Sequence, residues 1–342
     1  MTKNPKVSII IVNFNGKKWL KNCFDSISHL KYKNYEIICV DNNSSDDSIE
    51  YITQNYPQIL LIKNDINSGF TGGNNLGFEN SSGDYIWMLN NDTTVEPNSL
   101  GLMVDYMEKN LYIGSLQSKL ILMNDPNKLD VCGAYWTDST LLYHYGYYGD
   151  VGTPKYNIPI PFFSNKGASM MLRTSVLKIV GFLDNDFWCY YEETDLCNRI
   201  WLAGYECWYL PSAVVYHAGG GTSLSMPNDF IQFHNFKNKI LSIVKNYSIF
   251  SLFYIVPTHI CVIVSLSLFW LLKGKYKHSL SIFKAIWWNL TNLKKSITKR
   301  KIIQKFRVVN DRDIFKKTKK NPKLIYYKCL ILDLKKFQKY EK

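Results

Sequence analysis

The sequence predicts an α/β protein with a doubly wound, mostly parallel central sheet, helices on both faces of it, and a helical C-terminal region. Short β-branched runs alternate with helical patterns early in the chain, as is typical of parallel sheets. Polar clusters follow these runs, where ligands bind in such folds. An uncharged stretch over residues 249–272 and a basic tail indicate an appendage. With 342 residues, the chain can hold two domains, or one large domain with an appendage.

Charge is distributed unevenly along the chain. Residues 273–342 contain 22 Lys and Arg against 4 Asp and Glu, so the formal net charge of +13 comes from the tail. The eight cysteines show no zinc-ligand spacing, and several lie in apolar runs, which favours reduced core thiols and the cytosol. The N-terminus runs directly into a predicted strand, so we expect no signal peptide.

The first 63 residues predict a βαβαβ unit. Strands are expected over 7–12, 35–40 and 59–63, because these runs suit strands that are buried on both faces. Amphipathic helices are expected between them. The first two strands end in polar clusters, Asn13-Phe14-Asn15-Gly16 and Asp41-Asn42-Asn43-Ser44-Ser45-Asp46. We expect both clusters at the carboxyl edge of the sheet, where a ligand would bind.

A glycine-dense segment over residues 67–77 follows the third strand. Its backbone could approach a phosphate or a sugar, but it matches neither GxGxxG nor a Walker loop, and a plain flexible loop is the alternative. A fourth strand over 84–89 runs into Asn90-Asn91-Asp92-Thr93-Thr94. A carboxylate at such a strand end suits a divalent cation bound together with a diphosphate, and an ordinary Asp-Thr turn is the competing interpretation.

The middle of the chain offers a candidate acceptor region. A helix is expected over 100–109 and a strand over 113–123. Residues 131–163 are rich in Tyr, Gly and Pro, so they could stack on an acceptor sugar or form a surface loop. Gly167 and Ala168 precede an apolar helix or strand, and their small size would leave room for an acceptor.

The stretch 188–217 has the composition of a site. Four acidic residues and a final His217 lie among many aromatic residues, where carboxylates resist ionisation unless a cation or a substrate compensates them. A helix is expected over 194–204 and a strand over 207–216, so His217 could return beside the acids. Helix capping by the acids and a structural histidine are the alternatives.

Seven motifs in order resemble those of family 2 glycosyltransferases of GT-A fold: VSIIIVNFNG, VDNNSSD, NSGFTGGNNLG, LNND, KGASMMLR, YYEETDL and VVYH. They cover roughly residues 6–223, and the most similar group is the rhamnosyltransferase-like bacterial enzymes that build cell-surface polysaccharides. The resemblance implies a nucleotide-sugar-binding half over 1–100 and an acceptor and catalytic half over 101–225. The composition of residues 226–342 predicts a helical, basic, membrane-associating region.

The resemblance also assigns the donor and acceptor sites. Asp92, the last acid of a DxD-like triplet, would ligate Mg²⁺ or Mn²⁺, and His217 would approach the same metal. The base and ribose of a nucleotide-sugar would be held by Asn13, Phe14, Asp41 and Asn42. Its sugar diphosphate would be lined by Asn67, Gly69, Asn74, Asn75 and Gly77. Further donor candidates are Asn15, Asn91 and Lys237, and the acceptor candidates are Gly167, Ala168 and Trp188.

By the same resemblance, Glu193 occupies the position of the catalytic base, which takes a proton from the acceptor hydroxyl as it attacks the anomeric carbon with inversion. The chain departs from the family pattern twice. Asn90 stands where the first acid of the DxD triplet is usual, and Glu192-Glu193 replaces the usual Glu-Asp pair, so Glu192 is a rival base. We expect Asp195 to hold the geometry at the start of the helix.

The C-terminal region predicts contact with a membrane. Residues 249–272 are long enough to span one but are interrupted by Pro257 and His259. A single span would place the basic tail on the outer side, against the positive-inside rule, so we expect a re-entrant or interfacial hairpin. A second apolar face flanked by lysines, which suits anionic lipid, is formed by Leu280, Phe283, Ile286, Trp287, Leu290, Leu293 and Ile297. No nucleic-acid-binding motif accompanies the basic tail.

These features predict an inverting, metal-dependent, non-processive glycosyltransferase at the cytoplasmic face of the cell membrane. It would move a sugar from a UDP- or dTDP-sugar to a lipid-linked glycan in cell-surface polysaccharide synthesis. Non-processive transfer is inferred because the chain lacks the QxxRW motif of polymerising relatives. The alternatives are a polyprenyl-phosphate glycosyltransferase and a nucleotide-sugar-binding protein without catalytic activity.

Overall fold

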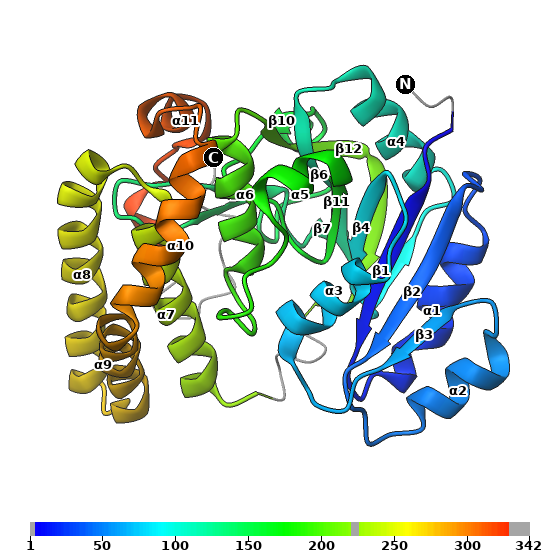
Figure 1. Cartoon of the computed structure of the whole chain (residues 1–342), viewed down its shortest axis with the longest axis horizontal. Helices are drawn as coiled ribbons and strands as arrows, with labels where there is room; N and C mark the ends of the chain where they lie inside the picture. The colour runs from blue at the N-terminus through cyan, green and yellow to red at the C-terminus, as the bar shows by residue number, and fades with distance from the viewer. Residues whose placement is uncertain (1–3, 220–225, 328–342) are drawn as a thin grey trace.

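The computed structural model of the protein describes residues 4–219 and 226–327, and its centre is a single mixed sheet (Figure 1). The N-terminal strands β1 (Val7–Asn13), β2 (Tyr35–Asp41), β3 (Leu60–Lys63) and β4 (Tyr85–Leu89) pair in parallel in the order β4-β1-β2-β3. This confirms the predicted parallel core. The carboxyl ends of these strands therefore lie along one edge of the sheet.

The second half of the chain extends the sheet beyond β4. Antiparallel β11 (Ser169–Arg173) lies between β4 and β6 (Ile113–Leu122), and β6 pairs in parallel with β12 (Glu206–His217). Three short antiparallel strands complete the sheet, namely β5 (Thr93–Val95), β7 (Asp125–Leu129) and β10 (Ile160–Pro161). Residues far apart in sequence are thereby brought beside the end of β4.

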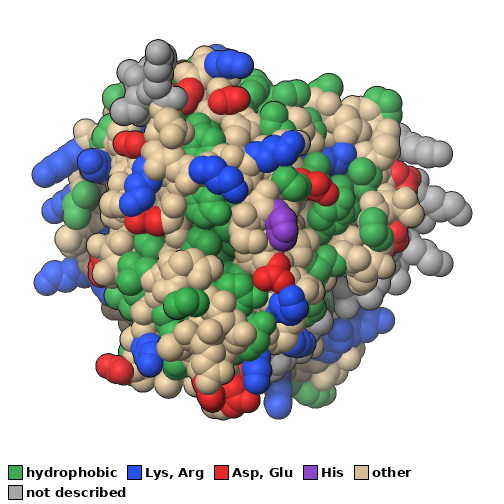
Figure 2. Space-filling view, turned by 90° about the vertical axis from the view of Figure 1, so that its right-hand side faces the viewer, with side chains coloured by type: hydrophobic (Ala, Val, Ile, Leu, Met, Phe, Trp, Pro, Cys, Tyr) green, Lys and Arg blue, Asp and Glu red, His purple; other side chains and the backbone are tan. Residues whose placement is uncertain are grey.

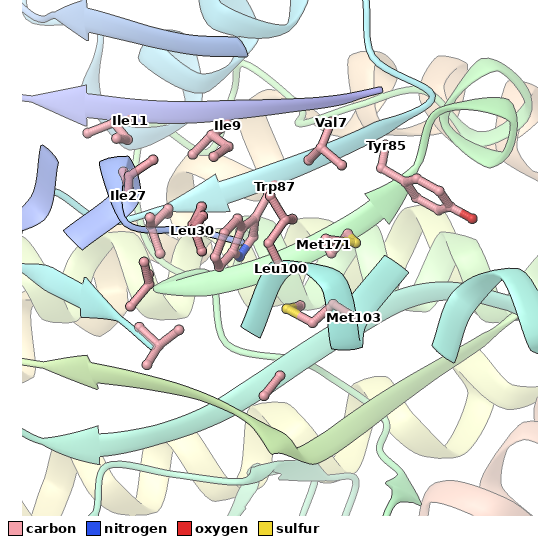
Figure 3. Packing of buried hydrophobic residues seen from close by; sticks show 14 of the residues in the cluster. Val7, Ile9, Ile11, Ile27, Leu30, Tyr85, Trp87, Leu100, Met103 and Met171 are labelled. Carbon is pink, nitrogen blue, oxygen red and sulfur yellow. The ribbon is translucent and has the colours of Figure 1, made fainter. Parts of the chain in front are cut away.

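Helices cover both faces of the sheet, as predicted. On one face, α1 (Lys17–Ser28), α2 (Ser48–Asn55) and α4 (Ser99–Lys109) bury side chains against the sheet residues Val7, Ile9 and Trp87 (Figure 3). The other face is covered by α3 (Gly69–Glu79), α5 (Thr174–Val180) and α6 (Glu192–Leu202), with Ile10, Met88 and Leu196 in the shared core. The apolar strands thus contribute side chains to a hydrophobic core on each face of the sheet. This explains why apolar and polar residues do not alternate along them.

The glycine-dense segment is mostly a helix, so its interpretation as a loop was wrong. Residues 69–79 form α3, and two of its glycines lie directly on β1. A Cβ on Gly73 would lie 2.6 Å from Val12 Cγ1, and one on Gly77 would lie 2.5 Å from Ile10 Cγ2. The glycines therefore allow helix and strand to approach closely, which the low helix propensity of glycine concealed in the sequence.

The aromatic segment 131–163 builds a small core of its own instead of an open wall. The two-stranded ribbon of β8 (Gly133–Tyr135) and β9 (Tyr143–Tyr145) leads to a 3₁₀ turn at Pro154–Tyr156. Tyr143, Tyr145 and Tyr156 are buried together with Phe162 and Tyr209. Most of these rings are consequently unavailable for stacking on a sugar.

The C-terminal region is a helical assembly packed against α6. It consists of α7 (Asn228–Asn246), α8 (Ile249–Leu272), α9 (Tyr276–Thr291), α10 (Leu293–Phe306) and α11 (Asp311–Thr318). The helix α7 lies at its centre and packs against α6, α8, α9 and α10. Lysines of α10 bind the loop before α6, because Lys295 pairs with Asp186 at 2.5 Å and Lys299 pairs with both Asp184 and Asp186.

The apolar helix α8 is unbroken, contrary to the expected interruption at Pro257 and His259. Pro257 lies within the helix, and buried His259 places Nδ1 2.9 Å from Thr140 Oγ1, whereas its Nε2 has no hydrogen-bond partner in the described part of the chain. Among the described residues, α8 is the one helix whose length and composition suit a membrane span, and 33% of its most apolar stretch is buried. Together with α9 it forms a helical hairpin.

The two ends of the molecule have different surfaces. The face on the right-hand side of Figure 1 shows Lys and Arg interspersed with Asp, Glu and small hydrophobic areas (Figure 2). The hairpin of α8 and α9 lies at the opposite end (Figure 1) and exposes large apolar side chains, including Phe250 at 80%, Phe253 at 76% and Trp287 at 68%. Exposed apolar groups of this size are typical of an interaction surface.

The contact between α3 and β1 can be tested by substitution. We expect Gly77→Val to lower the free energy of unfolding by about 1–3 kcal/mol, because the new side chain overlaps Ile10 in a closed core. Urea denaturation followed by circular dichroism measures the change. Gly152→Val is the control, since no atom lies within 4 Å of a Cβ there. Equal stabilities of the two variants would contradict the packing described.

Candidate active site

The ends of β5 and β12 place Asp92 beside His217. The two strands pair with His217 opposite Thr93, so the imidazole reaches the preceding carboxylate. His217 Nε2 lies 3.3 Å from Asp92 Oδ1, and His217 Nδ1 lies 2.8 Å from Asp130 Oδ2. Burial would lower the pKa of His217, but hydrogen bonds to Asp130 and Asp92 outweigh it and raise this pKa to about 9. The ring is therefore a cation between two carboxylates at neutral pH.

The Asp92–His217 pair has the donor chemistry of a divalent-cation site. At metal–ligand distances of about 2.1 Å, neighbouring ligands of an octahedral ion lie about 3 Å apart, close to the 3.3 Å between Asp92 Oδ1 and His217 Nε2. Asp130 holds Nδ1 and so orients the ring, which would ligate a metal through Nε2 after losing the proton that faces Asp92. In the described part of the chain, no cluster of three His, Cys, Asp or Glu side chains suits a metal. The pair therefore fits a cation whose other ligands come from a diphosphate and water.

The carboxyl ends of β1 and β2 join three predicted donor-site residues beside Asp92. Asn13 Nδ2 donates a hydrogen bond to Asp41 Oδ2 at 2.8 Å, and Asn91 Nδ2 donates to Asn13 Oδ1 at 2.8 Å. Gly16 is required at this crossing, because a Cβ there would lie 2.2 Å from Asn91 Nδ2. The network is buried, so its polar side chains are held in fixed positions at the strand ends.

The turn after β1 carries two further predicted donor residues. Phe14 is half-buried, and Asn15 is exposed in the left-handed region with φ +49. Asn15 Oδ1 accepts a hydrogen bond from the Ser45 backbone N–H at 2.7 Å. This bond ties the turn after β1 to the loop after β2, so both loops border the same end of the sheet.

Asn42 organises the N-terminal end of α3. Its Nδ2 donates to Asn67 Oδ1 at 3.0 Å and to the Gly69 carbonyl at 2.9 Å. Gly69 has φ +71, and a Cβ there would lie 2.4 Å from the Trp188 carbonyl, so glycine is required for two reasons. Trp188 Nε1 in turn donates to the Asn67 carbonyl at 3.4 Å. Trp188, predicted on the acceptor side, therefore packs directly on the donor loop.

The remaining predicted residues of α3 bond to the protein itself. Asn74 is buried and donates to the carbonyl one turn earlier at 2.8 Å. Asn75 Nδ2 donates to Asn185 Oδ1 at 2.6 Å, which links α3 to the loop before α6. Gly77 lies against β1. Contacts of these three residues with a sugar diphosphate stay a prediction.

Glu192 and Glu193 begin α6 with carboxylates that the protein does not neutralise. One carboxylate oxygen of each is buried and has no hydrogen-bond partner in the described part of the chain. Burial, together with the charge of Glu193, raises the pKa of Glu192 well above its usual range. This shift disfavours the charged form of Glu192, so Glu193 is the favoured candidate for the base and Glu192 stays its rival.

Gly167 and Ala168 connect the metal end of the site to Glu193. The Ala168 carbonyl accepts a hydrogen bond from the Asn90 backbone N–H at 3.0 Å. A Cβ on Gly167 would lie 3.3 Å from the Phe70 ring and 3.8 Å from Glu193 Cβ. The predicted acceptor residues thus lie between the strand end that leads to Asp92 and the helix that carries the base.

Asp195 holds α6 in place. The carboxylate is fully buried and accepts hydrogen bonds from Arg199 Nε at 3.0 Å and Asn246 Nδ2 at 2.8 Å, with Lys245 Nζ at 2.9 Å. Burial would raise its pKa, but the charges of Lys245 and Arg199 outweigh burial and keep the pKa below the usual value. These contacts fit the expected positioning role at the start of the helix.

Lys237 links α7 to the loop before α6. Lys237 Nζ donates a hydrogen bond to the Asp186 carbonyl at 2.6 Å and lies 4.8 Å from the centre of the Trp288 ring. Burial lowers the pKa of Lys237 to about 8, although Asp186 opposes this shift. The predicted contact with the donor diphosphate remains a prediction for this amine.

The sequence analysis did not identify Asp130, which orients His217. Asp130 lies just after β7, 87 residues before its partner, in a segment without a recognisable motif. The two residues meet because β6 pairs with both β7 and β12. A histidine in a metal site usually has a carboxylate partner, so such a partner could be expected from the sequence. Only the sheet topology identifies it as Asp130.

The fold and the site define an α/β protein with polar residues at the carboxyl edge of its sheet, where such folds bind ligands in a cleft. A carboxylate–histidine pair and an acidic pair with unpaired oxygens belong to this region. Residues 8–170 match the protein family described as "Glycosyl transferase family 2". This part of the chain is therefore similar to glycosyltransferases of family 2. The finer, rhamnosyltransferase-like grouping stays an expectation of the resemblance.

Two curated relatives support this assignment. The low-salt glycan biosynthesis hexosyltransferase Agl10 of Haloferax volcanii is 27% identical over 197 residues, covering 56% of this chain and 61% of that protein. An uncharacterized glycosyltransferase of Haemophilus influenzae is 24% identical over 233 residues, covering 67% of this chain and 70% of its own. The chain thus spans less than two thirds of the first of these relatives.

Solved structures share the GT-A fold. GalNAc-T7 with UDP, GalNAc and Mn²⁺ gives a TM-score of 0.59 at 16% identity, over 74% of this chain and 50% of that one. The mannosyltransferase PcManGT of Pyrobaculum calidifontis, in complex with GDP-Man and Mn²⁺, gives a TM-score of 0.52 at 12% identity. The match covers 89% of this chain and 86% of the PcManGT chain. At these identities the similarity establishes the fold.

The role of Asp130 leads to a measurable change in His217. We expect Asp130→Asn to lower the pKa of His217 from about 9 toward the ordinary value of 6.5, because a charged hydrogen-bond partner is lost. The wild-type ring should stay protonated through neutral pH, whereas the ring of the variant should titrate there. Histidine-selective ¹⁵N NMR of the metal-free protein, over a pH range of about 5 to 10 that includes both pKa values, follows the titration. Identical titration curves would refute this account of the pair.

Proposed function

We propose that the protein is an inverting, metal-dependent, non-processive glycosyltransferase that moves a sugar from a UDP- or dTDP-sugar to a lipid-linked glycan. The observation that carries the proposal is the sequence of contacts along one cleft. Asp41 is bonded through Asn13 to Asn91 beside Asp92, and Gly167 adjoins Glu193. A donor held at one end of this cleft would face the base at the other.

The donor end of the cleft would hold the nucleotide and its diphosphate. Asn13, Asp41 and Asn42 offer fixed polar groups to the base and ribose, and Asp92 with His217 would hold Mg²⁺ or Mn²⁺. When bound, such a cation neutralises the charge that develops on the departing diphosphate. Asp130 keeps His217 Nε2 directed toward Asp92, so the protein orients this ligand before the donor arrives.

The acceptor end supplies the base. Glu193 would take the proton of the acceptor hydroxyl while the hydroxyl oxygen attacks the anomeric carbon and the bond to the diphosphate breaks. Attack from the side opposite the leaving group inverts the configuration. The raised pKa of Glu192 disfavours a second negative charge next to the base.

The two glutamates should respond differently to amide substitution. We expect Glu193→Gln to lower kcat by about 10²–10⁴-fold with little effect on the KM of the donor, because only proton transfer is lost. Glu192→Gln resembles the protonated form and should keep most of the activity. Steady-state kinetics with both variants, and NMR of the anomeric configuration of the product, test the proposal. A Glu193→Gln variant with full activity would instead favour a polyprenyl-phosphate acceptor, which scarcely needs a base.

The donor and acceptor can be identified from products. Mass spectrometry of reactions that combine a panel of nucleotide-sugars with extracted lipid-linked acceptors would reveal the transferred sugar. Nucleotide-sugar binding without transfer or hydrolysis under any metal or acceptor would favour the non-catalytic alternative, which is motivated by Asn90 in place of the first DxD acid.

The apolar hairpin supports a location at the cytoplasmic face of the membrane. The helix α9 exposes Leu280 at 53%, Phe283 at 50% and Trp287 at 68%, and lysines flank this face. Aromatic and aliphatic groups beside lysines suit the interface of an anionic bilayer. In this arrangement a lipid-linked acceptor would reach the cleft from the same surface to which the enzyme binds.

Membrane association should depend on this exposed face. We expect the double substitution Phe283→Gln and Trp287→Gln to reduce co-flotation with vesicles of anionic lipid several-fold, because two large apolar groups no longer enter the bilayer interface. Leu111→Gln is the matched control, since Leu111 is 52% exposed outside the C-terminal helices. Unchanged flotation of the double variant would defeat the assignment of this face.

A further inference from the structure

Residues 187–191, which lead into the first turn of α6, have an unusual backbone. Trp188, Tyr190 and Tyr191 adopt the left-handed conformation, with φ of +63, +66 and +72. A bulky residue rarely adopts this conformation, because its Cβ comes too close to the following carbonyl oxygen. Three such residues so close together persist only where neighbouring groups hold the backbone in place.

Asn238 of α7 holds this segment through its side-chain amide. Its Nδ2 donates hydrogen bonds to three carbonyls of the segment, those of Phe187 at 3.0 Å, Cys189 at 2.7 Å and Tyr190 at 2.6 Å. Asn238 is fully buried, and its Oδ1 has no hydrogen-bond partner in the described part of the chain. The amide of Asn238 is thus directed at the backbone of this one segment.

The segment joins the donor loop to the candidate base. At one end, the Trp188 carbonyl accepts a hydrogen bond from the Thr71 backbone N–H of α3 at 3.0 Å. At the other end, Tyr191 caps α6, and its carbonyl accepts a hydrogen bond from the Asp195 backbone N–H at 2.9 Å. A shift of Tyr191 would therefore move the first turn of α6, and Glu193 with it.

The two ends of the segment are held by different groups. Trp188 has contacts of its own, because its Nε1 donates to the Asn67 carbonyl at 3.4 Å and its ring lies 5.2 Å from the Phe230 ring. Asn238 bonds to the residues on either side of Trp188 and to Tyr190, which leads into α6. Loss of the Asn238 amide should consequently displace the start of α6 more than the donor loop.

We propose that Asn238 is a positioning residue for sugar transfer: its amide stabilises the left-handed backbone before α6 and so sets the position of Glu193. The inference rests on the proposed function, because it assigns Asn238 a role through the proposed base. A displacement of a catalytic group by about 1 Å can lower the rate about 10²-fold. Asn238 acts through Glu193 and needs no contact with a substrate.

Asn289 of α9 provides a matched control. Like Asn238, it is buried, and its Oδ1 has no hydrogen-bond partner in the described part of the chain. Its Nδ2 also donates to backbone carbonyls, those of Lys237 at 3.0 Å and Ala285 at 2.9 Å. These bonds stay within α7 and α9. Asn289→Ala therefore removes the same kind of interaction without releasing residues 187–191.

Hydrogen–deuterium exchange tests the role of Asn238 without measuring turnover. We expect Asn238→Ala to speed exchange of the Cys189 and Asp195 amides about tenfold or more, because both amides donate to carbonyls within the segment. Asn289→Ala should leave this exchange unchanged. Equal exchange in the wild type and Asn238→Ala would overturn the proposal. Faster exchange in a protein that transfers no sugar would uphold the hold on the backbone and defeat the proposed function, so the two failures are distinguishable.

Steady-state kinetics separates positioning from general destabilisation. We expect Asn238→Ala to lower kcat about tenfold or more and to change the KM of the donor by less than about threefold, because the contacts of Trp188 with the donor loop remain. Asn289→Ala should keep the kcat of the wild type at a similar loss of melting temperature. An unchanged kcat for Asn238→Ala, or an equal fall for both variants, would contradict a positioning role.

A second substitution tests whether the backbone conformation is what Asn238 supplies. Glycine adopts positive φ without the steric cost of a side chain, so Tyr190→Gly in the Asn238→Ala background should recover kcat in part. No recovery would refute the proposed link between the amide and the left-handed backbone. Asn238→Ser, which keeps one hydrogen-bond donor, replaces Asn238→Ala in every measurement if the alanine variant does not fold.

Discussion

The buried ion cluster around Lys245 holds the catalytic helix against the C-terminal region. Lys245 of α7 bridges Asp184, in the loop before α6, and Asp195, in its first turn. Removing one partner from a buried pair of this kind typically costs about 3–5 kcal/mol, because a charge is left uncompensated. The orientation of α6, and with it the position of Glu193, therefore depends on a helix that lies outside the matched family domain.

This cluster extends to the surface that faces a proposed membrane. Lys295 and Lys299 of α10 bind the same acidic loop, whose Asn185 also contacts Asn75 of α3. One loop thus joins α3, α6 and α10. The contacts give two of the 22 Lys and Arg of residues 273–342 a structural role, whereas composition alone would assign their charge to lipid or nucleic acid.

The protein combines satisfied and unsatisfied charges in a systematic way. Asp195, which positions α6, has partners in Arg199, Lys245 and Asn246. By contrast, one oxygen each of Glu192 and Glu193 has no partner in the described part of the chain. Because burial without a partner is unfavourable, these groups indicate where substrate charge and hydrogen bonds are expected to enter.

The sequence by itself determined the parallel strands β1 to β4, the helices on both faces, and the polar residues at the strand ends, because local periodicity and strand-end chemistry are written in short segments. It could not reveal that residues 69–79 are helical, because close packing on β1 outweighs the low propensity of glycine there. Tertiary structure alone decided that Asp130 orients His217, that burial raises the pKa of Glu192, and that Lys245 pairs with Asp184 and Asp195. Each of these depends on groups far apart in the chain, since burial and electrostatic pairing arise only when distant strands and helices meet.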